Sequence, residues 1–441
     1  MALVPNWIDV ANETFASIRG GRSESIVVDG STLWGVFPQN ADETIYYLYK
    51  SIDAGVTWTD TGLDVGTGTS FYAPIFDSTG HRARTLIKHD GKLYYFGATN
   101  NGYIHWSVFD LSTPTLPWTE WAYLTGYSVA LANSGTLFAG SREDADLILA
   151  YQSVAGSINN ITVKKYNGSW STIGTIEGTT YHGVLAYGMM DSSNGNAHIF
   201  FQRAIVDVDD PLAEVPDFCH VAVDFSDDSI TSTHVIESAV DMQTGFGTPP
   251  VGPGDISGAT IAAPYGVDVQ DQLYNSSSYG QLKVAFGDMT SDPLSPTWST
   301  TTVAAEHTLD WPVQANQQCQ VAYDGATPWV YYATPYPDAV GGTPYPNFLL
   351  RRSSYVSAAW TTPEVWYDSS VADAILDPLR ATHNDLDTLA NFQLVKGFAS
   401  SFGIMVDVEQ WYAGYEGPAL RANNYVSAGG PMVSRGNYAS A

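Results

Sequence analysis

The sequence predicts an all-β fold in which one four-stranded unit recurs about every 60 residues. Hydrophobic residues make up 44% of the 441-residue chain and charged residues only 15%, against roughly 25% charged residues in a typical soluble protein. The polar content comes instead from Gly, Ser, Thr, Asn and Tyr, which favour strands and turns over helices. A recurring tryptophan supplies the second observation, because its spacing indicates a repeat.

Tryptophan followed by Thr or Ser marks the same place in each unit. The dipeptide occurs at Trp58, Trp118, Trp170, Trp298 and Trp360. The successive intervals are 60, 52, 128 and 62 residues, and the longest equals two steps of 64. We therefore expect a sixth member near Ile230-Thr231, where the Trp has been lost. A fixed period of this length is typical of repeat architectures.

Each period contains four short segments with strand character. In the first unit, SIVVDG and STLWGVF surround Asp29-Gly30, a dipeptide typical of tight hairpin turns, and ETIYYLYKS and WTDTGL follow. The second unit again has an Asp-Gly pair, Asp90-Gly91, at its first turn. Four antiparallel strands repeated around an axis form a β-propeller, which leaves few sheet edges exposed.

The two ends of the chain predict how the ring closes. Residues 386–413 supply about three strands and lack a fourth, whereas the N-terminal segment NWIDVA has Trp7 at the repeat position. We expect residues 1–414 to form seven blades, with the segment around Trp7 beside the strand that contains Trp411. Six blades with a separate C-terminal appendage is the alternative.

Residues 415–441 have no alternating pattern and few large aliphatic side chains. We expect an extended C-terminal arm that docks on a neighbouring subunit, because free tails of this composition seldom stay ordered. Its apolar anchors are predicted to be Leu420, Tyr425, Met432 and Tyr438.

The segment from Ser51 to Trp58 reads S-I-D-A-G-V-T-W and resembles the Asp-box of sialidase-like β-propellers. In such a turn Ser51 and Asp53 satisfy backbone donors, Gly55 takes a positive φ, and Trp58 packs between blades. The resemblance implies that this turn joins the third and fourth strands of a blade. It covers residue identity in one unit only.

The catalytic pattern of the sialidases is not reproduced. The resemblance implies three arginines on the substrate carboxylate, a Tyr–Glu nucleophile pair and an Asp acid. Arg22, 29 residues before Ser51, stands near the place of the first arginine, but Ser23-Glu24 follows it instead of Ile-Pro. The second strand is followed by Pro38-Gln39-Asn40 rather than an arginine-bearing acidic turn. We therefore expect no catalytic residues, with a sialidase-like glycoside hydrolase as the alternative.

Four long irregular segments, 204–218, 241–258, 334–348 and 368–380, are predicted to project from one face. Loops elaborated on one face of a rigid scaffold mark an interaction surface. Tyr265, Tyr336 and Tyr345 are the candidate ligand-binding rings, suited to stacking on sugars or anchoring an interface. Asp207, Asp209 and Asp210 are candidate ligands for Ca²⁺, with a solvated acidic loop as the alternative; no other cofactor is expected.

The chain carries 18 basic and 46 acidic residues, a net charge of −28. Such a surface repels nucleic acid and anionic membranes, so neither is expected as a partner. Cys219 and Cys319 lie in apolar strand-like runs and are predicted to be buried free thiols. No apolar run reaches the roughly 18 residues of a membrane span, and the N-terminus does not resemble a signal peptide.

Asp-box propellers mostly act outside cells, yet no export signal is found, and a virion protein resolves this conflict because virus particles leave by lysis. We expect a non-enzymatic structural protein of a tailed virus, located in the virion as part of its tail, fibre or capsid surface. Its partners would be other virion proteins or further copies of itself, and host cell-surface glycan is a candidate ligand for host attachment. A lectin-like carbohydrate-binding propeller, intracellular or exported without a leader, is a second alternative. The alternative to a place in the virion is an extracellular location.

Overall fold

The structure is a computed structural model of the whole chain. The residues that it describes are 6–9, 23–30, 32–38, 46–52, 58–64, 84–98, 103–114, 119–125, 137–142, 146–155, 158–177, 181–191, 193–205, 217–238, 254–269, 279–303, 319–335, 348–368, 374–377, 379–381, 391–396, 401–406, 424–425 and 433–434. All regular secondary structure in these ranges is β-strand.

The first half of the chain forms one large sheet and one small one. The nine-stranded sheet contains two antiparallel meanders: β2 (Ser23–Asp29), β3 (Thr32–Pro38), β4 (Tyr46–Ser51) and β5 (Thr59–Asp64), then β6 (Arg84–His89), β7 (Lys92–Ala98), β8 (Tyr103–Asp110) and β9 (Thr119–Thr125). Short parallel pairings join β2 to β6 and to β29 (Leu379–Ala381). The next sheet is β10 (Leu137–Arg142), β11 (Asp146–Ala155), β12 (Ile158–Tyr166) and β13 (Trp170–Ile176).

Three further sheets follow in chain order. The first is β14 (Tyr181–Asp191), β15 (Asn196–Ile205), β16 (Asp217–Asp224), β17 (Ser229–Ile230) and β18 (His234–Glu237). The second is β19 (Asp255–Ser257), β20 (Thr260–Val269), β21 (Tyr279–Asp288) and β22 (Thr297–Thr302). The third is β23 (Cys319–Asp324), β24 (Thr327–Pro335), β25 (Phe348–Val356), β26 (Ala359–Trp360) and β27 (Glu364–Asp368).

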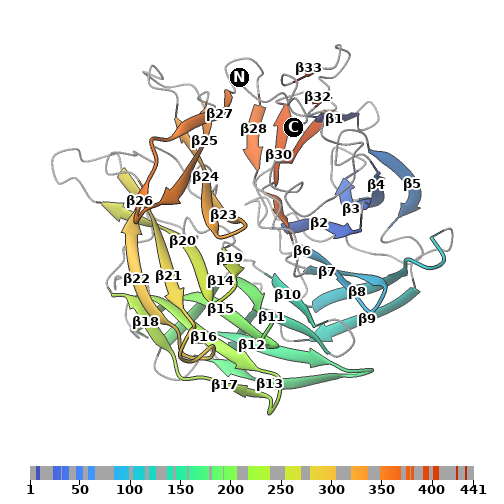
Figure 1. Cartoon of the computed structure of the whole chain (residues 1–441). Helices are drawn as coiled ribbons and strands as arrows, with labels where there is room; N and C mark the ends of the chain where they lie inside the picture. Colours follow the sequence, from blue (N-terminus) through green and yellow to red (C-terminus); the bar gives the residue numbers. More distant parts are fainter. Residues whose placement is uncertain are drawn as a thin grey trace.

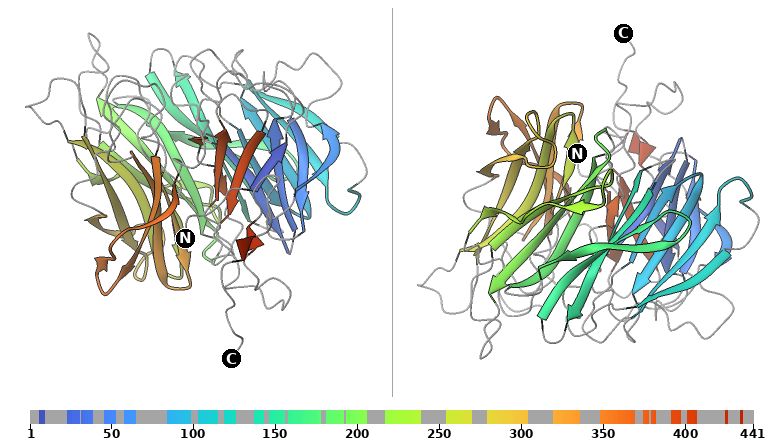
Figure 2. Two further views of the ribbon diagram at one scale, coloured as in Figure 1. Left: turned by 90° about the horizontal axis from the view of Figure 1, so that it is seen from above. Right: turned by 90° about the horizontal axis from the view of Figure 1, so that it is seen from below.

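The last large sheet brings the two ends of the chain together. Its order is β1 (Asn6–Asp9), β31 (Ser401–Val406), β30 (Asn391–Lys396) and β28 (Ala374–Asp377). A separate two-stranded hairpin, β32 (Asn424–Tyr425) and β33 (Val433–Ser434), is the described part of residues 415–441. Figure 1 shows the sheets following one another around a ring, and Figure 2 shows them standing side by side in two further views. The fold is all-β, and its small antiparallel sheets resemble the blades of a propeller.

The predicted pairing of the N-terminal segment with C-terminal strands is confirmed, although the partner differs. Trp7 lies opposite Gly403 and Ile8 opposite Phe402 in an antiparallel pair. The partner is therefore β31, and Trp411 lies outside the described residues. The sheet also begins earlier than predicted, because β28 falls in the segment 368–380 that was expected to be a loop.

The first turn of several units has the predicted chemistry. Gly30 and Gly91 have φ of 58° and 66°, and Asp90 has φ of 47°. Positive φ at both central residues is the requirement of a type I′ hairpin, which explains Asp90-Gly91. Gly325, after Asp324, repeats the feature with φ of 58°.

The recurring tryptophan position is confirmed where the structure describes it. Trp170, Trp298 and Trp360 lie in β13, β22 and β26, each paired with the end of the third strand of its sheet. Ile230 occupies the equivalent place in β17, opposite Val223, as predicted for the lost Trp. Trp118 lies outside the described residues.

Three of the turns after the third strand share a local hydrogen bond. Asp110 accepts from the backbone N of Ser112 (2.8 Å), Asp224 from that of Ser226 (2.7 Å), and Asp288 from that of Thr290 (2.9 Å). These are Asx turns, in which the side chain replaces a backbone acceptor. The same location therefore carries an Asp-x-Ser/Thr turn in units that lack the longer S-x-D-x-G-x-T-W motif.

In two sheets the outermost strand is interrupted at a threonine. The backbone and side chain of this threonine make the hydrogen bonds that a strand residue would otherwise make to the neighbouring strand. Between β17 and β18, Thr231 donates its backbone N–H to the carbonyl O of Ala222 (2.9 Å), and its Oγ1 accepts from Ala222 N (2.9 Å). Between β26 and β27, Thr361 makes the same two bonds to Ser354, at 2.9 and 3.0 Å. The side-chain oxygen thus substitutes for a backbone carbonyl, and the strand resumes beyond it.

The hydrophobic core lies between neighbouring sheets. One cluster joins Trp106 and Phe96 of the β6–β9 meander to Leu149 and Tyr151 of the next sheet. Two more clusters lie on either side of the sheet β14–β18. Since the sheets from β6–β9 to β19–β22 each bury both faces against their neighbours, these sheets stabilise one another.

Candidate interaction face

Strand directions place the strand ends that flank three of the four predicted loop segments at one edge of the sheets. Antiparallel order puts the end of a second strand, the start of the third, and the start of the first strand at the same edge. Segments 206–216 and 336–347 lie between second and third strands, as predicted, because Ile205 and Asp217, and Pro335 and Phe348, flank them. Segment 241–258 lies between two sheets, but its end is β19 rather than loop.

Most of the predicted site residues lie outside the described part of the chain. They are Asp53, Gly55, Asp207, Asp209, Asp210, Tyr336, Tyr345, Leu420, Met432 and Tyr438, and Arg22 of the sialidase-like alternative also lies outside it. Tyr425 belongs to β32. Ser51 is buried at the end of β4 and Trp58 is partly buried just before β5, so the predicted turn does join third and fourth strands.

The prediction that Tyr265 lies in a ligand-facing loop is wrong. Tyr265 lies in β20, its side chain is fully buried, and its ring stacks on Phe218 of the neighbouring sheet with 4.6 Å between centroids. Its hydroxyl donates to Glu237. Burial, and then Glu237, raise the pKa of this hydroxyl, which therefore stays a donor. Its place within the continuous apolar run IAAPYGV was a readable signal of burial.

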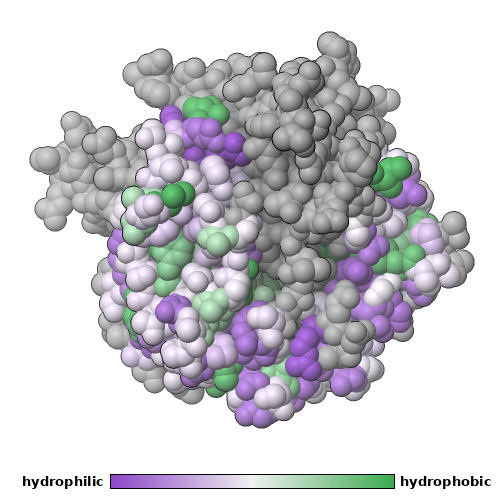
Figure 3. Space-filling model, in the orientation of Figure 1, coloured by the Kyte–Doolittle hydropathy of each residue, from purple (hydrophilic) through white to green (hydrophobic). Residues whose placement is uncertain are grey.

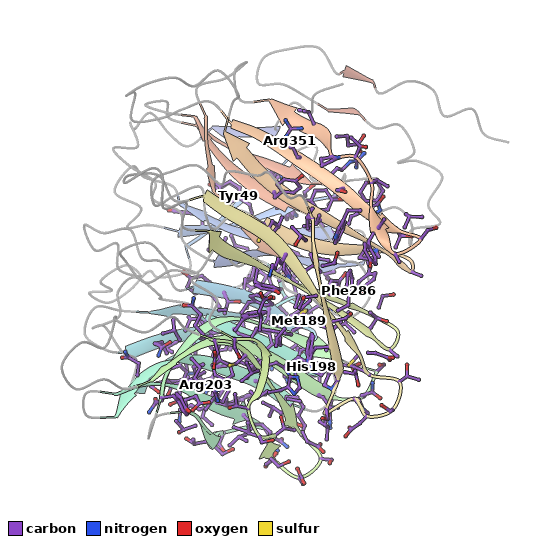
Figure 4. The ribbon with its side chains drawn as sticks, turned by 90° about the vertical axis from the view of Figure 1, so that its left-hand side faces the viewer. Tyr49, Met189, His198, Arg203, Phe286 and Arg351 are labelled. Atoms are coloured by element: carbon purple, nitrogen blue, oxygen red, sulfur yellow. The ribbon has the colours of Figure 1, made fainter. Side chains whose placement is uncertain are left out.

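A polar cluster surrounds Arg203 near the end of β15, at the edge that carries segment 206–216. Arg203 Nη2 donates to Asp217 Oδ2 (2.9 Å), and its guanidinium lies 4.4 Å from the ring centroid of Tyr181. Its Nη1 is 4.0 Å from Glu177 Oε1, which accepts from Thr233 Oγ1 (2.7 Å). Glu177 follows β13, so the cluster joins two sheets. Figure 4 labels Arg203 at the end of the green strands.

A related cluster lies one sheet further on. Glu237 follows Glu177 by 60 residues, one repeat, and also ends the outer strand of its sheet. It accepts from Lys283 Nζ (2.5 Å) and from the Tyr265 hydroxyl, both in the following sheet. Acidic residues at the same repeat position thus link two successive pairs of sheets.

Two further arginines among the described residues also contact carboxylates. Arg352 of β25 pairs with Glu364 of β27 and lies 5.0 Å from the Trp329 ring centroid. Arg142 Nη2 is 3.5 Å from Asp146 Oδ2. Together with Arg203, these arginines lie on three different sheets, each already paired with an acid.

Cys219 and Cys319 are buried free thiols, as predicted, and burial raises the pKa of the Cys219 thiol to about 12. Among the described residues no group of three His, Cys, Asp or Glu side chains is arranged to hold a metal ion. In the same part of the chain, no helix has the length and apolar character needed to cross a membrane. Figure 3 shows a mainly hydrophilic described surface on one face, with hydrophobic residues in small separate patches.

Comparison with known proteins shows similarity at the level of fold. The polysaccharide lyase Uly1 is similar with a TM-score of 0.55 and 10% identity, over 92% of this chain and 99% of the lyase. A second similar structure is the fucose-recognising lectin of Aleuria aurantia, which has a six-bladed β-propeller fold. Its TM-score is 0.40 and its identity 11%, over 80% of this chain and 97% of the lectin. The α-L-arabinanase of Penicillium chrysogenum has a TM-score of 0.40 and 11% identity, over 92% of this chain and 98% of that protein.

No protein-family model matches the sequence, and no curated protein sequence matches it. At these identities the structural likeness concerns the fold alone, which is all-β and built from small antiparallel sheets that resemble the blades of a propeller.

Proposed function

We propose that this chain is a non-enzymatic β-propeller that serves as a binding and assembly component of a virus particle. The observation that carries the non-enzymatic half is the pairing of Arg142, Arg203 and Arg352 with carboxylates on three separate sheets. A site that binds an acidic sugar needs cations that converge and are free to meet the ligand. These three arginines are already paired with carboxylates and lie on separate sheets. Their arrangement therefore favours a structural role of the propeller over a catalytic one.

The finer architecture that we propose is a ring of seven blades. Six units run in chain order from β2 to β27, and the sheet β28, β30, β31 and β1 supports a seventh, built from both ends of the chain. Pairing of β1 with β31 then closes the ring without a covalent link.

Deletion of residues 1–12 tests this closure. The shortened chain would expose the edge of β31 and separate the two ends of the ring, so we expect a marked loss of stability in urea denaturation. The alternative architecture, six blades with a C-terminal appendage, predicts instead that the deletion leaves the urea midpoint unchanged.

The assembly half of the proposal concerns residues 415–441, whose partners would be further copies of the chain or other virion proteins. The experiment is sedimentation of the full chain and of a chain that ends at residue 414. We expect the full chain to form larger species and the shortened chain to remain a monomer that unfolds at the same urea concentration. Monomers in both cases, at concentrations up to those of a packed particle, would contradict self-assembly.

The non-enzymatic half has its own test. The purified full chain is incubated with a reporter substrate that releases sialic acid, and no release above buffer is expected. Release that Arg22→Ala abolishes would replace the proposal by a sialidase-like hydrolase. Retention on a glycan array without turnover, lost on Tyr336→Ala or Tyr345→Ala, would instead favour a lectin-like role with the same scaffold.

A further inference from the structure

Two histidines meet inside the ring, between the sheets β14–β18 and β19–β22. His198 of β15 and His220 of β16 are both buried, and their rings stack with 5.2 Å between centroids. His198 Nδ1 lies 2.9 Å from His220 Nε2, so one ring donates to the other. Figure 4 places His198 near Met189, among the side chains between the green and yellow strands.

The surroundings of the pair are mostly aromatic. From the following sheet, Trp298 of β22 lies against His220 at 5.0 Å and against Phe200 at 5.7 Å between ring centroids. Buried His198 Nε2 has no hydrogen-bond partner among the described residues. A second proton on His198 would therefore place a charge where no acceptor is arranged for it.

The titratable groups near the pair come from two neighbouring strands. Burial lowers the pKa of His198, and Asp191 at the end of β14 only partly opposes this, because its carboxylate already accepts from Ser193 and Asn194 in its own turn. His234 of β18 pairs with His220 across the strands and lowers the pKa of that histidine. Trp298 of β22 carries no titratable group.

Burial decides the charge state of the pair. It lowers the pKa of His198 to about 4, and burial followed by the neighbouring histidines lowers that of His220 well below its usual value. Since an unfolded histidine has a pKa near 6.5, the unfolded chain binds protons below that pH while the folded pair does not. The contribution of the pair to stability is therefore intact above about pH 6.5 and is lost as the pH falls toward 4.

We propose that the His198–His220 pair makes the junction between the sheets β14–β18 and β19–β22 an acid-sensitive latch, which opens before the rest of the ring when the surroundings become acidic. The inference stands apart from the proposed function. Protonation of the pair destabilises the packing of Trp298 on His220, which is the contact that joins the two sheets at this point. The protein would thereby sense acidification in the range where histidines act as pH switches.

The preceding junction supplies an internal reference. There Gln152 of β11 bridges to the next sheet, with its Nε2 donating to Gly183 O (2.7 Å) and its Oε1 accepting from Leu185 N (3.0 Å). An amide does not titrate in this range, so the junction between β10–β13 and β14–β18 should hold at the pH that opens the other.

Hydrogen exchange of the full chain at pH 7 and pH 4.5, corrected for the intrinsic pH dependence of exchange, tests the latch. Each buried histidine lowers the folded-to-unfolded ratio about tenfold per pH unit below 6.5, so the pair lowers it by about 100-fold per unit. We expect at least a tenfold loss of protection at pH 4.5 in β15, β16 and β22, and unchanged protection in β11 and β12. An equal loss in all sheets, or none, would overturn the proposal.

The double variant His198→Leu/His220→Leu removes both titrating groups and should abolish the difference between the two pH values. His234→Gln is the matched control, because this histidine is exposed on β18, and it should keep the difference. Persistence of the loss in the double variant would contradict the latch.

A histidine NMR titration of the unaltered chain keeps the idea testable if the double variant does not fold. Two of the nine histidines should stay neutral below pH 5.5 and then change together with the β22 signals. Titration of all nine histidines near pH 6.5, without loss of protection in β22, would contradict the proposed latch.

Discussion

The two junctions on either side of the sheet β14–β18 occupy the same repeat positions but use different chemistry. Toward β10–β13, the contacts include Ile230, the buried amide of Gln152, and the Lys165–Asp228 ion pair. Toward β19–β22, they include Trp298 and the His198–His220 pair. The difference teaches that the repeat fixes where neighbouring sheets touch and leaves the type of contact free to vary.

The two outer-strand residues illustrate the point. Ile230 packs over Gly174, where an added Cβ would lie 2.9 Å from Ile230 Cδ1. Trp298 instead faces a stack of rings that includes Phe200 and His220. A small residue opposite an isoleucine, and aromatic rings opposite a tryptophan, are two ways to fill the same space at interior packing density.

The largest effect is expected from truncating Trp298, and Ile230 at the equivalent place gives the comparison. Trp298→Ala should lower the free energy of unfolding by about 3–5 kcal/mol, near the lower end because the indole is only partly buried, and Ile230→Ala by about 2 kcal/mol. Urea denaturation at pH 7.5, where the histidine pair is neutral, measures both. A larger loss for Ile230→Ala would show that the aromatic junction contributes less than its area suggests.

A matched pair of glutamines sharpens the comparison. Gln152→Leu leaves Gly183 O and Leu185 N without this partner, and each unsatisfied buried group costs about 1–3 kcal/mol, so we expect a loss of at least about 2 kcal/mol. Gln202, at the other junction, is buried, and its Nε2 has no partner among the described residues. Gln202→Leu should therefore be neutral within about 1 kcal/mol, or stabilising. Equal losses would mean that volume, not hydrogen bonding, decides both sites.

The smallest effect is expected at the ion pairs. Asp228 is largely exposed, so Lys165→Met should change the free energy of unfolding by about 0.5 kcal/mol or less. Lys283→Met should cost about 1 kcal/mol, because both partners of the Lys283–Glu237 pair are mostly shielded. Repeating both denaturations in 1 M NaCl checks the assignment, since added salt should reduce the Lys165 difference first.

Local chemistry made much of the fold predictable from the sequence. The Asp-Gly turns at Gly30 and Gly91 need positive φ, and few other residues adopt it readily. The period of about 60 residues located the tryptophan position well enough to identify Ile230 as its substitute. β28 was missed because its four residues, AILD, are too short to show an alternating pattern.

The contacts between sheets were not predicted, because they depend on which faces meet in space. Glu177 and Glu237, one repeat apart, were a readable signal for the clusters around Arg203 and Lys283. His198 and His220 stand in the apolar runs AHIFFQ and FCHVAV, so their burial was readable, but their meeting follows from the register in which Phe200 lies opposite His220. The predicted loop residues Tyr336 and Tyr345 stay predictions.

The threonines that interrupt two outer strands have a consequence for solubility. An outer strand exposes a row of unused backbone groups, and a straight row is a template on which a strand of another molecule can add. At Thr231 and Thr361 a hydroxyl stands in for the carbonyl, and the strand breaks for three residues before it resumes. A strand of another molecule could therefore pair with only two regular residues, those of β17 or of β26, before the interruption at the threonine. The rim of the ring can carry open edges on these sheets and still resist edge-to-edge aggregation.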